Sequence, residues 1–298
     1  MATRVGSKTG FLTAAVLVAL AAGCRKADDD YQGQIGASVG EVMASADEAA
    51  NGSSATAMLP ALPILRAPDE LRGPLWRRAL NAIEPSAYAA SCFPFSFSTC
   101  GDGVRTESFS DCAFGIATLD GSVTLTFTDT AACSLSAAPD SVTRTASFTV
   151  TGPYGGTLAV SSPGGGQTLT RTADGFTFAV PGMERVLTGP GGRTLFDIGT
   201  ATSTPLAITG SSRADFTIAS GTLVVTHHLA GYAVSLTPQN LTWTTHCNCA
   251  ASGSLTGTVS GGKADGKSAT VTITGCGTAD VTIDGDTESV VMDRCAAI

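Results

Sequence analysis

From about Ser91 to Ile298, the chain alternates apolar residues with threonine and serine. In one stretch, Val123, Leu125 and Phe127 are separated by single threonines. Side chains two residues apart point to the same face of a strand, so this period predicts strands with one buried and one solvated face. The same period recurs at other apolar positions: Phe148, Val150, Phe176, Phe178, Val180, Phe216, Ile218, Val271 and Ile273. The region is therefore predicted to be a succession of short strands.

Glycine, proline and aspartate interrupt this alternation at short intervals. Turns are predicted at Asp174-Gly175, Ala230-Gly231, Asp284-Gly285 and the longer Ser162–Gly166. Strands so closely spaced leave no room for crossover helices, so the sheet should be antiparallel. Two all-β architectures remain open. One is a sandwich, or two stacked small sandwiches, and the other is a long, strongly curved sheet or open barrel.

One helix is predicted ahead of the strands, over Asp69–Ile83. Asp69 can cap its first turn, and Pro74 lies near enough to the start to be tolerated. Apolar residues recur at helical spacing, at Leu71, Leu75, Leu80 and Ile83. We expect this helix to pack on the sheet, and in the curved architecture to lie across the concave side.

Residues 25–63 are rich in Ala, Ser, Gly, Asp and Glu and hold few large apolar residues. Ser38–Ala50 could form one short helix with Val39, Val42 and Met43 on a single face. Disorder or a loose linker is the preferred interpretation, because the segment offers little apolar surface to bury.

The N-terminus carries the pattern of an export signal. Its first ten residues include Arg4 and Lys8 and no acidic residue, and Phe11–Ala22 then runs apolar for twelve residues. Twelve residues are too few to cross a bilayer of about 30 Å as a helix. The apolar run stops at Gly23-Cys24, where small residues precede the expected cut.

Leu20–Cys24 (LAAGC) resembles the lipobox of bacterial lipoprotein precursors, although Ala21 stands where Leu is most usual. The resemblance implies that residues 1–23 are removed and that Cys24 is acylated, with palmitate expected, and anchors the protein in a membrane. Arg25 follows in place of aspartate, which by the same resemblance implies the outer membrane, on either its periplasmic or its surface face. Ordinary signal cleavage, giving a soluble secreted protein, is the alternative.

These signals divide the chain into four parts. We expect a signal peptide over 1–23, a lipidated tether over 24–63, a helical segment over 64–90 and an all-β domain over 91–298.

Apart from Cys24, the chain holds an even set of cysteines, which fits disulfides in an oxidising compartment. They form an early and a late group of four: Cys92, Cys100, Cys112 and Cys133, then Cys247, Cys249, Cys276 and Cys295. Cys247 and Cys249 would share one face of a strand, so each should pair with Cys276 or Cys295 and not with the other. We expect two bridges in each group, and each group leaves three connectivities open.

Composition narrows the class of partner. Of 298 residues only 14% are charged, and 17 basic against 25 acidic residues give a net charge of −8. Loss of the two basic residues of the signal would take the mature chain to −10. This balance excludes charge-driven disorder, a coiled coil and a nucleic-acid partner.

Gly261–Ser268 (GGKADGKS) matches the phosphate-loop pattern GxxxxGKS letter for letter. That chemistry requires a helix after the loop, so that the helix N-terminus faces the phosphates. A strand-like stretch, Ala269–Thr274, follows instead. We therefore interpret the motif as a hydrophilic hairpin turn, and expect no nucleotide or other cofactor.

Two further groups could suggest a metal ion. Zinc would need Cys247 and Cys249 with His227, His228 and His246, but on strands these side chains face apart, and the usual C-x-x-C spacing is missing. Disulfides with surface histidines are the preferred interpretation. Calcium would need Asp284-Gly285-Asp286 with Glu288, but the twelve-residue calcium loop is not matched, so a charged turn is expected.

No G-x-S-x-G elbow or other catalytic signature is present, and we expect a protein that is not an enzyme. The leading hypothesis is an outer-membrane-anchored lipoprotein that acts as a structural or interaction module of the bacterial envelope. The alternative is a carrier for a lipid or another apolar ligand, held between helix and curved sheet. That architecture would resemble bacterial lipoprotein-localisation carriers, a likeness of fold alone. Carbohydrate binding is a third hypothesis, with Trp243, Tyr232 and Tyr154 as candidate aromatics.

Overall fold

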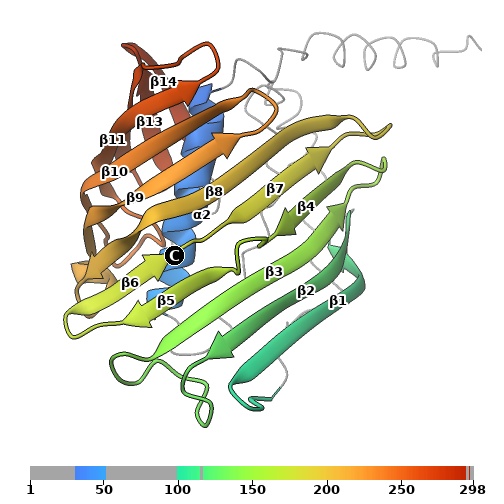
Figure 1. Ribbon diagram of the computed structural model, residues 1–298, viewed down its shortest axis with the longest axis vertical. Helices are drawn as coiled ribbons and strands as arrows, with labels where there is room; N and C mark the ends of the chain where they lie inside the picture. Colours follow the sequence, from blue (N-terminus) through green and yellow to red (C-terminus); the bar gives the residue numbers. More distant parts are fainter. Residues whose placement is uncertain (1–30, 52–98, 115–116, 293–294, 296–298) are drawn as a thin grey trace, which may run out of the picture.

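The computed structural model describes residues 31–51, 99–114, 117–292 and 295, and fourteen strands of this part form one antiparallel sheet (Figure 1). In chain order the strands are β1 (Val104–Phe114), β2 (Ala117–Phe127), β3 (Ser141–Thr151), β4 (Thr157–Ser161), β5 (Gln167–Arg171), β6 (Gly175–Ala179), β7 (Met183–Thr188), β8 (Thr194–Thr209), β9 (Thr217–His227), β10 (Tyr232–Thr242), β11 (Ser252–Gly261), β12 (Ser268–Gly275), β13 (Thr278–Ile283) and β14 (Asp286–Val291). The all-β, antiparallel prediction is confirmed. Because the strands belong to a single sheet that curves around helix α2 (Tyr31–Asn51), the sandwich architecture is wrong and the curved sheet is observed.

The strand order follows the chain except in the middle of the sheet. Residues 147–151 of β3 pair with β4, whereas residues 141–144 pair with β5. β8 likewise pairs with β7 through its first half and with β6 through its second half. The β4–β7 pair and the β5–β6 hairpin therefore lie end to end between β3 and β8. The sheet is split where they meet.

The predicted period places the apolar residues on the inner, concave face of the sheet. On β3, Val142, Phe148 and Val150 are buried, whereas Thr143 and Thr145 between them are partly exposed on the outer face. The other apolar positions that the period singled out are buried as well. All four predicted turn sites fall at connections between strands, so the pattern located the strands and their turns correctly.

Helix α2 lies on the inner face and overturns the prediction of a loose linker for residues 31–51 (Figure 1). Its small residues allow a close approach: a Cβ added to Gly36 would overlap the side chain of Val290 on β14. Ile35 and Val39 are fully buried. The predicted helix at Asp69–Ile83 lies outside the described residues. In the described part of the chain, no helix is long and apolar enough to cross a membrane.

Polar contacts fix both ends of α2. At its start, Tyr31 stacks on Tyr232 of β10 with ring centroids 4.1 Å apart, and its hydroxyl accepts a hydrogen bond from the backbone N–H of Lys263 at 3.1 Å. Near its end, Asp47 accepts two hydrogen bonds of 2.7 Å from the guanidinium of Arg213, in the short 3-10 helix between β8 and β9. The helix therefore runs along the inner face from one end of the strands to the other.

Three disulfides close the described part of the sheet. Cys247 pairs with Cys276 and Cys249 with Cys295, the partners expected from their spacing, and Cys100 pairs with Cys133. Cys112 is disulfide-bonded too, and Cys92 lies outside the described residues. The two sulfur atoms of the Cys249–Cys295 bridge lie 3.8 and 3.6 Å from the carbonyl oxygen of Gly40, so this bridge packs directly against α2.

Candidate functional site

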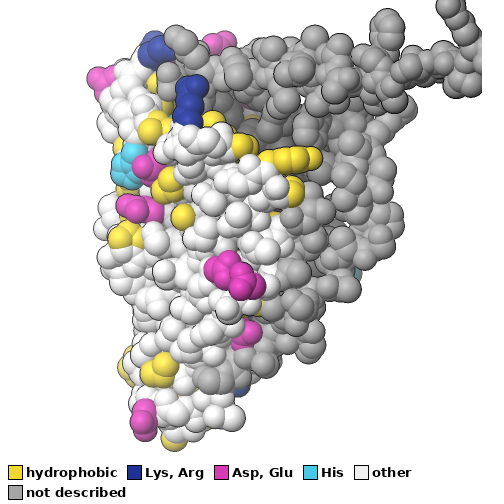
Figure 2. All heavy atoms as spheres, turned by 90° about the vertical axis from the view of Figure 1, so that its right-hand side faces the viewer, with side chains coloured by type: hydrophobic (Ala, Val, Ile, Leu, Met, Phe, Trp, Pro, Cys, Tyr) yellow, Lys and Arg dark blue, Asp and Glu magenta, His cyan; other side chains and the backbone are white. Residues whose placement is uncertain are grey.

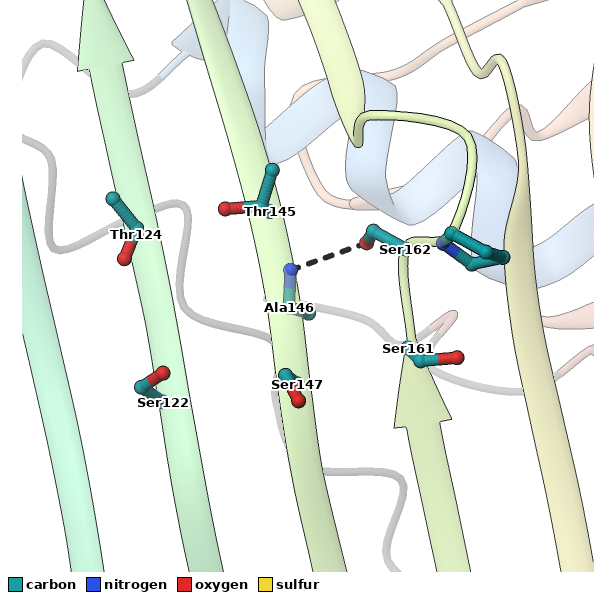
Figure 3. Close-up of a pocket in the computed structure, with 8 residues that line it drawn as sticks. Ser122, Thr124, Thr145, Ala146, Ser147, Ser161 and Ser162 are labelled. Carbon is teal, nitrogen blue, oxygen red and sulfur yellow. Dashed lines mark hydrogen bonds between the residues drawn. The ribbon is translucent and has the colours of Figure 1, made fainter.

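A polar pocket of about 280 Å³ opens on the outer face, where the sheet is split (Figure 3). It is lined by β2, β3 and the end of β4, through Ser122, Thr124, Thr145, Ala146, Ser147, Ser161, Ser162 and Pro163. The pocket lies at the split because β4 ends at Ser161, where the chain turns away from β3. Beyond this point the side chain of Ser162, in place of a backbone carbonyl, bonds β3. The backbone N–H of Ala146 donates to the Ser162 hydroxyl oxygen at 3.1 Å.

The chemistry of this pocket is that of hydroxyl groups. Six of its eight lining residues are serine or threonine, and none is titratable. Hydroxyls both donate and accept hydrogen bonds, which suits water or a small neutral polar group, but supplies no acid or base near neutral pH. The pocket therefore has the means for weak polar binding and lacks the groups for proton transfer.

Buried polar side chains form a second cluster, on the inner face under α2. Arg144 of β3 donates to Gln167 of β5 at 3.0 Å, and the Gln167 amide lies 3.5 Å from the sulfur of Met183. Arg185 of β7 donates to the hydroxyl of Ser38 on α2 at 3.1 Å. These side chains are at most 6% exposed. A buried polar group must be hydrogen-bonded to be tolerated, so the Arg185–Ser38 contact helps to fix how α2 is rotated on the sheet.

The sequence analysis missed this cluster, although the chain carries its signal. Arg144 stands in phase with the apolar residues Val142 and Ala146, and Arg185 stands in phase with Met183 and Leu187. A charged residue in the buried phase of a strand indicates a buried polar contact. The pattern of one strand does not show the partner: Arg144 bonds Gln167 on another strand, and Arg185 bonds Ser38 on α2, 147 residues away in the chain.

The residues considered for zinc are not brought together as ligands. Cys247 and Cys249 lie in the loop between β10 and β11, not on a strand as expected, and both are in disulfides. His246 and His228 are exposed, but His227 is buried, so the expectation of a surface histidine is wrong there. The Nδ1 atom of His227 accepts a hydrogen bond from the backbone N–H of Ala230 at 3.1 Å, which closes the β9–β10 turn.

The sequence Gly261–Ser268 connects β11 to β12, as the hairpin interpretation predicted. The backbone N–H of Gly261 donates to the carboxylate of Asp265 at 2.6 Å, so the loop is closed by its own acidic residue. Lys267 forms an ion pair with Asp284 of the β13–β14 turn. The strand β12 follows the loop where a phosphate loop would be followed by a helix, so the loop does not have the geometry of a phosphate loop.

The acidic turn considered for calcium connects β13 to β14. The carboxylate of Asp284 forms an ion pair with Lys267, and Glu288 lies on β14 beyond the turn. Among the described residues, no three His, Cys, Asp or Glu side chains are grouped so that they could hold a metal ion.

Of the three candidate aromatics for carbohydrate binding, two are core residues. Trp243 is 4% exposed, and its ring packs edge-on against Phe216. Tyr232 is 2% exposed under Tyr31. Tyr154, by contrast, is 83% exposed at the tip of the β3–β4 hairpin, far along β3 from the polar pocket.

The surroundings of Asp129 and Arg213 shift their pKa values. The backbone N–H of Ala132 and the hydroxyl of Ser134 donate to Asp129, and these bonds hold the pKa of its carboxyl below the ordinary value. The hydrogen bonds to Asp47 raise the pKa of the Arg213 guanidinium. Both groups stabilise structure, one in an exposed loop and one at the end of α2.

Cys24, the predicted lipidation site, lies outside the described residues. No family model matches the chain, and neither a curated protein nor a solved structure matches it.

Proposed function

We propose that this chain is a non-enzymatic lipoprotein of the bacterial envelope, anchored to the outer membrane through Cys24, and that it acts as a structural or interaction module. The observation that carries the proposal is the position of α2. A carrier of an apolar ligand needs an open apolar cavity, and here the protein's own helix packs on the concave face against β5, β13 and β14.

The outer face supports the role of an interaction module. Threonine and serine lie opposite one another across neighbouring strands, with hydroxyl pairs such as Thr143–Thr168 at 2.9 Å and Thr282–Thr287 at 2.8 Å. Such a surface offers many weak hydrogen bonds and little apolar area, which suits reversible polar contacts.

The anchor is tested in a Gram-negative host that expresses the full chain in the presence of radiolabelled palmitate. We expect label on the protein and recovery in the outer-membrane fraction, both lost in Cys24→Ser. Label and membrane recovery that persist in Cys24→Ser would contradict the anchor at this residue.

The carrier alternative is tested on the same purified protein by mass spectrometry of extracted lipids. We expect no lipid in the extract in a stoichiometric amount, because acyl chains bound covalently at Cys24 stay on the protein. A free lipid that co-purifies in a one-to-one ratio would contradict the proposed role and support a carrier.

A further inference from the structure

The two ends of the strands form two rims of different character. Five described hairpin connections lie at the end where α2 begins, and we name this end the anchor rim; they span residues 152–156, 189–193, 228–231, 262–267 and 284–285. Tyr31 is fixed to this rim by Tyr232 and by the backbone of Lys263. The connections at the other end form the distal rim.

Exposed apolar side chains gather at the anchor rim. Of the four large hydrophobic residues that are exposed in the described chain, three lie within two residues of its connections. Tyr154, 83% exposed, lies at the β3–β4 tip, Leu195 follows the β7–β8 tip and Leu229 lies at the β9–β10 tip. Figure 2, which views the side toward which these tips point, shows hydrophobic side chains in the upper part of the described surface and basic ones near its top.

Charge also differs between the rims. Near the anchor rim, the basic residues Arg193, Lys263 and Lys267 are matched in number by Asp265, Asp284 and Asp286. Near the distal rim, five aspartates outnumber three arginines, of which Arg213 is already paired with Asp47; the aspartates are Asp102, Asp129, Asp140, Asp174 and Asp215, and the arginines are Arg105, Arg171 and Arg213. An acidic rim is repelled by an anionic membrane surface, whereas a near-neutral rim with apolar tips is not.

The short segment between Cys24 and Tyr31 limits the distance between the folded sheet and the membrane. Seven residue steps separate Cys24 from Tyr31, and these can extend over at most about 25 Å. Tyr31 itself is held at the anchor rim. A lipid on Cys24 would therefore keep Tyr31, and the part of the anchor rim around Tyr232 and Lys263, within about 25 Å of the bilayer.

From these observations we infer that the anchor rim rests on the lipid bilayer, with Tyr154, Leu195 and Leu229 at the headgroup level and the acidic distal rim pointing away. The inference rests on the proposed anchor at Cys24. Aromatic and aliphatic side chains on separate hairpin tips can enter the interface without unfolding any strand, and tyrosine is favoured at that depth.

The test places one tryptophan at each rim of the full-length, lipidated protein. Tyr154→Trp and Leu229→Trp report on the anchor rim, and Ala173→Trp, in the exposed β5–β6 turn, is the matched control at the distal rim. Each variant is reconstituted into phosphatidylethanolamine–phosphatidylglycerol vesicles with and without brominated acyl chains. The signal of the parent protein, with its native Trp76 and Trp243, is subtracted.

We expect brominated lipid to remove roughly half of the added fluorescence of Tyr154→Trp and Leu229→Trp, because aromatic rings at the interface lie at headgroup depth, and to leave that of Ala173→Trp nearly unchanged. Equal quenching at both rims, or none at either in a vesicle-bound protein, would overturn the orientation alone. If the mass of the purified protein shows no lipid on Cys24, both the anchor and the orientation are overturned.

Discussion

On strand β6, Phe178 and Thr177 are neighbours in the chain but belong to different surfaces. Phe178 is 1% exposed on the inner face, whereas Thr177 lies on the outer face opposite Thr170 of β5. The contrast holds along most strands: the inner face and α2 bury the apolar residues, and the outer face carries hydroxyls. Burial on the inner face therefore supplies most of the stability. The outer face can remain exposed and make contacts with other molecules.

The largest difference in the free energy of unfolding is expected between substitutions at Phe178 and Thr177. Phe178→Ala should lower the free energy of unfolding by about 4 kcal/mol, because it removes a buried aromatic ring and leaves a cavity. Thr177→Ala should change it by less than about 0.5 kcal/mol. Chemical denaturation of both variants measures the difference. Comparable losses of unfolding free energy would show that the outer face stabilises the fold as much as the buried face does.

The Cys249–Cys295 bridge links the loop after β10 to the C-terminal end and packs on Gly40 of α2. Its removal in the double variant Cys249→Ala, Cys295→Ala should cost about 3 kcal/mol, because the unfolded chain gains freedom when a loop closed over 46 residues is opened. Urea denaturation of the variant and the parent provides the measurement. An unchanged urea midpoint would contradict a stabilising role of the bridge at the side of the sheet that α2 covers.

Arg213 connects the distal end of α2 to the sheet. Arg213→Gln should cost about 2 kcal/mol, because the Asp47 side chain that it contacts is fully buried. Arg193→Gln, at an exposed hairpin tip, is the matched control and should cost almost nothing. If thermal unfolding gives the two variants the same Tm, the helix is not clamped through this ion pair.

The smallest effect is expected in the exposed loop before β3. Because the pKa of Asp129 is lowered in the folded state, its carboxylate contributes stability above the unfolded pKa, and this contribution is lost as the pH falls through the folded pKa. Asp129→Asn should therefore lower the Tm at neutral pH, and the gap to the parent should close below about pH 4. Asp174→Asn serves as a control, and a gap that widens in acid would contradict the assignment.

Strands and turns follow from local rules. The alternation around Phe127 or Ile273 and the glycine-containing turns are properties of a few consecutive residues, which a single sequence displays. The spacing of Cys247 and Cys249 argued against their pairing with each other, although they lie in a loop and not on a strand, and it left open which of them bonds Cys276 and which Cys295. The strands and turns could therefore be predicted without knowledge of the rest of the fold.

Helix α2 could not be predicted in the same way. Its residues are small, with Gly33, Gly36 and Gly40 within two turns. The narrow stripe of Val39, Val42 and Met43 indicated a short helix over Ser38–Ala50 as the less favoured alternative, and α2 contains that segment. It is stabilised by the surface that it meets: Gly36 is needed only because Val290 approaches so closely. The split between β4 and β5, and with it the polar pocket, depends equally on long-range pairing.

Helix α2 is part of the folded core and packs on the concave face against β5, β13 and β14. Hydrogen exchange of its backbone amides in the full-length native protein tests this most directly. The account predicts that the amides between Ile35 and Ala46 exchange as slowly as those of β9, β10 and β13, through global unfolding. Exchange as fast as in an exposed peptide, with the strands still protected, would show that the helix leaves the face open and would contradict the account.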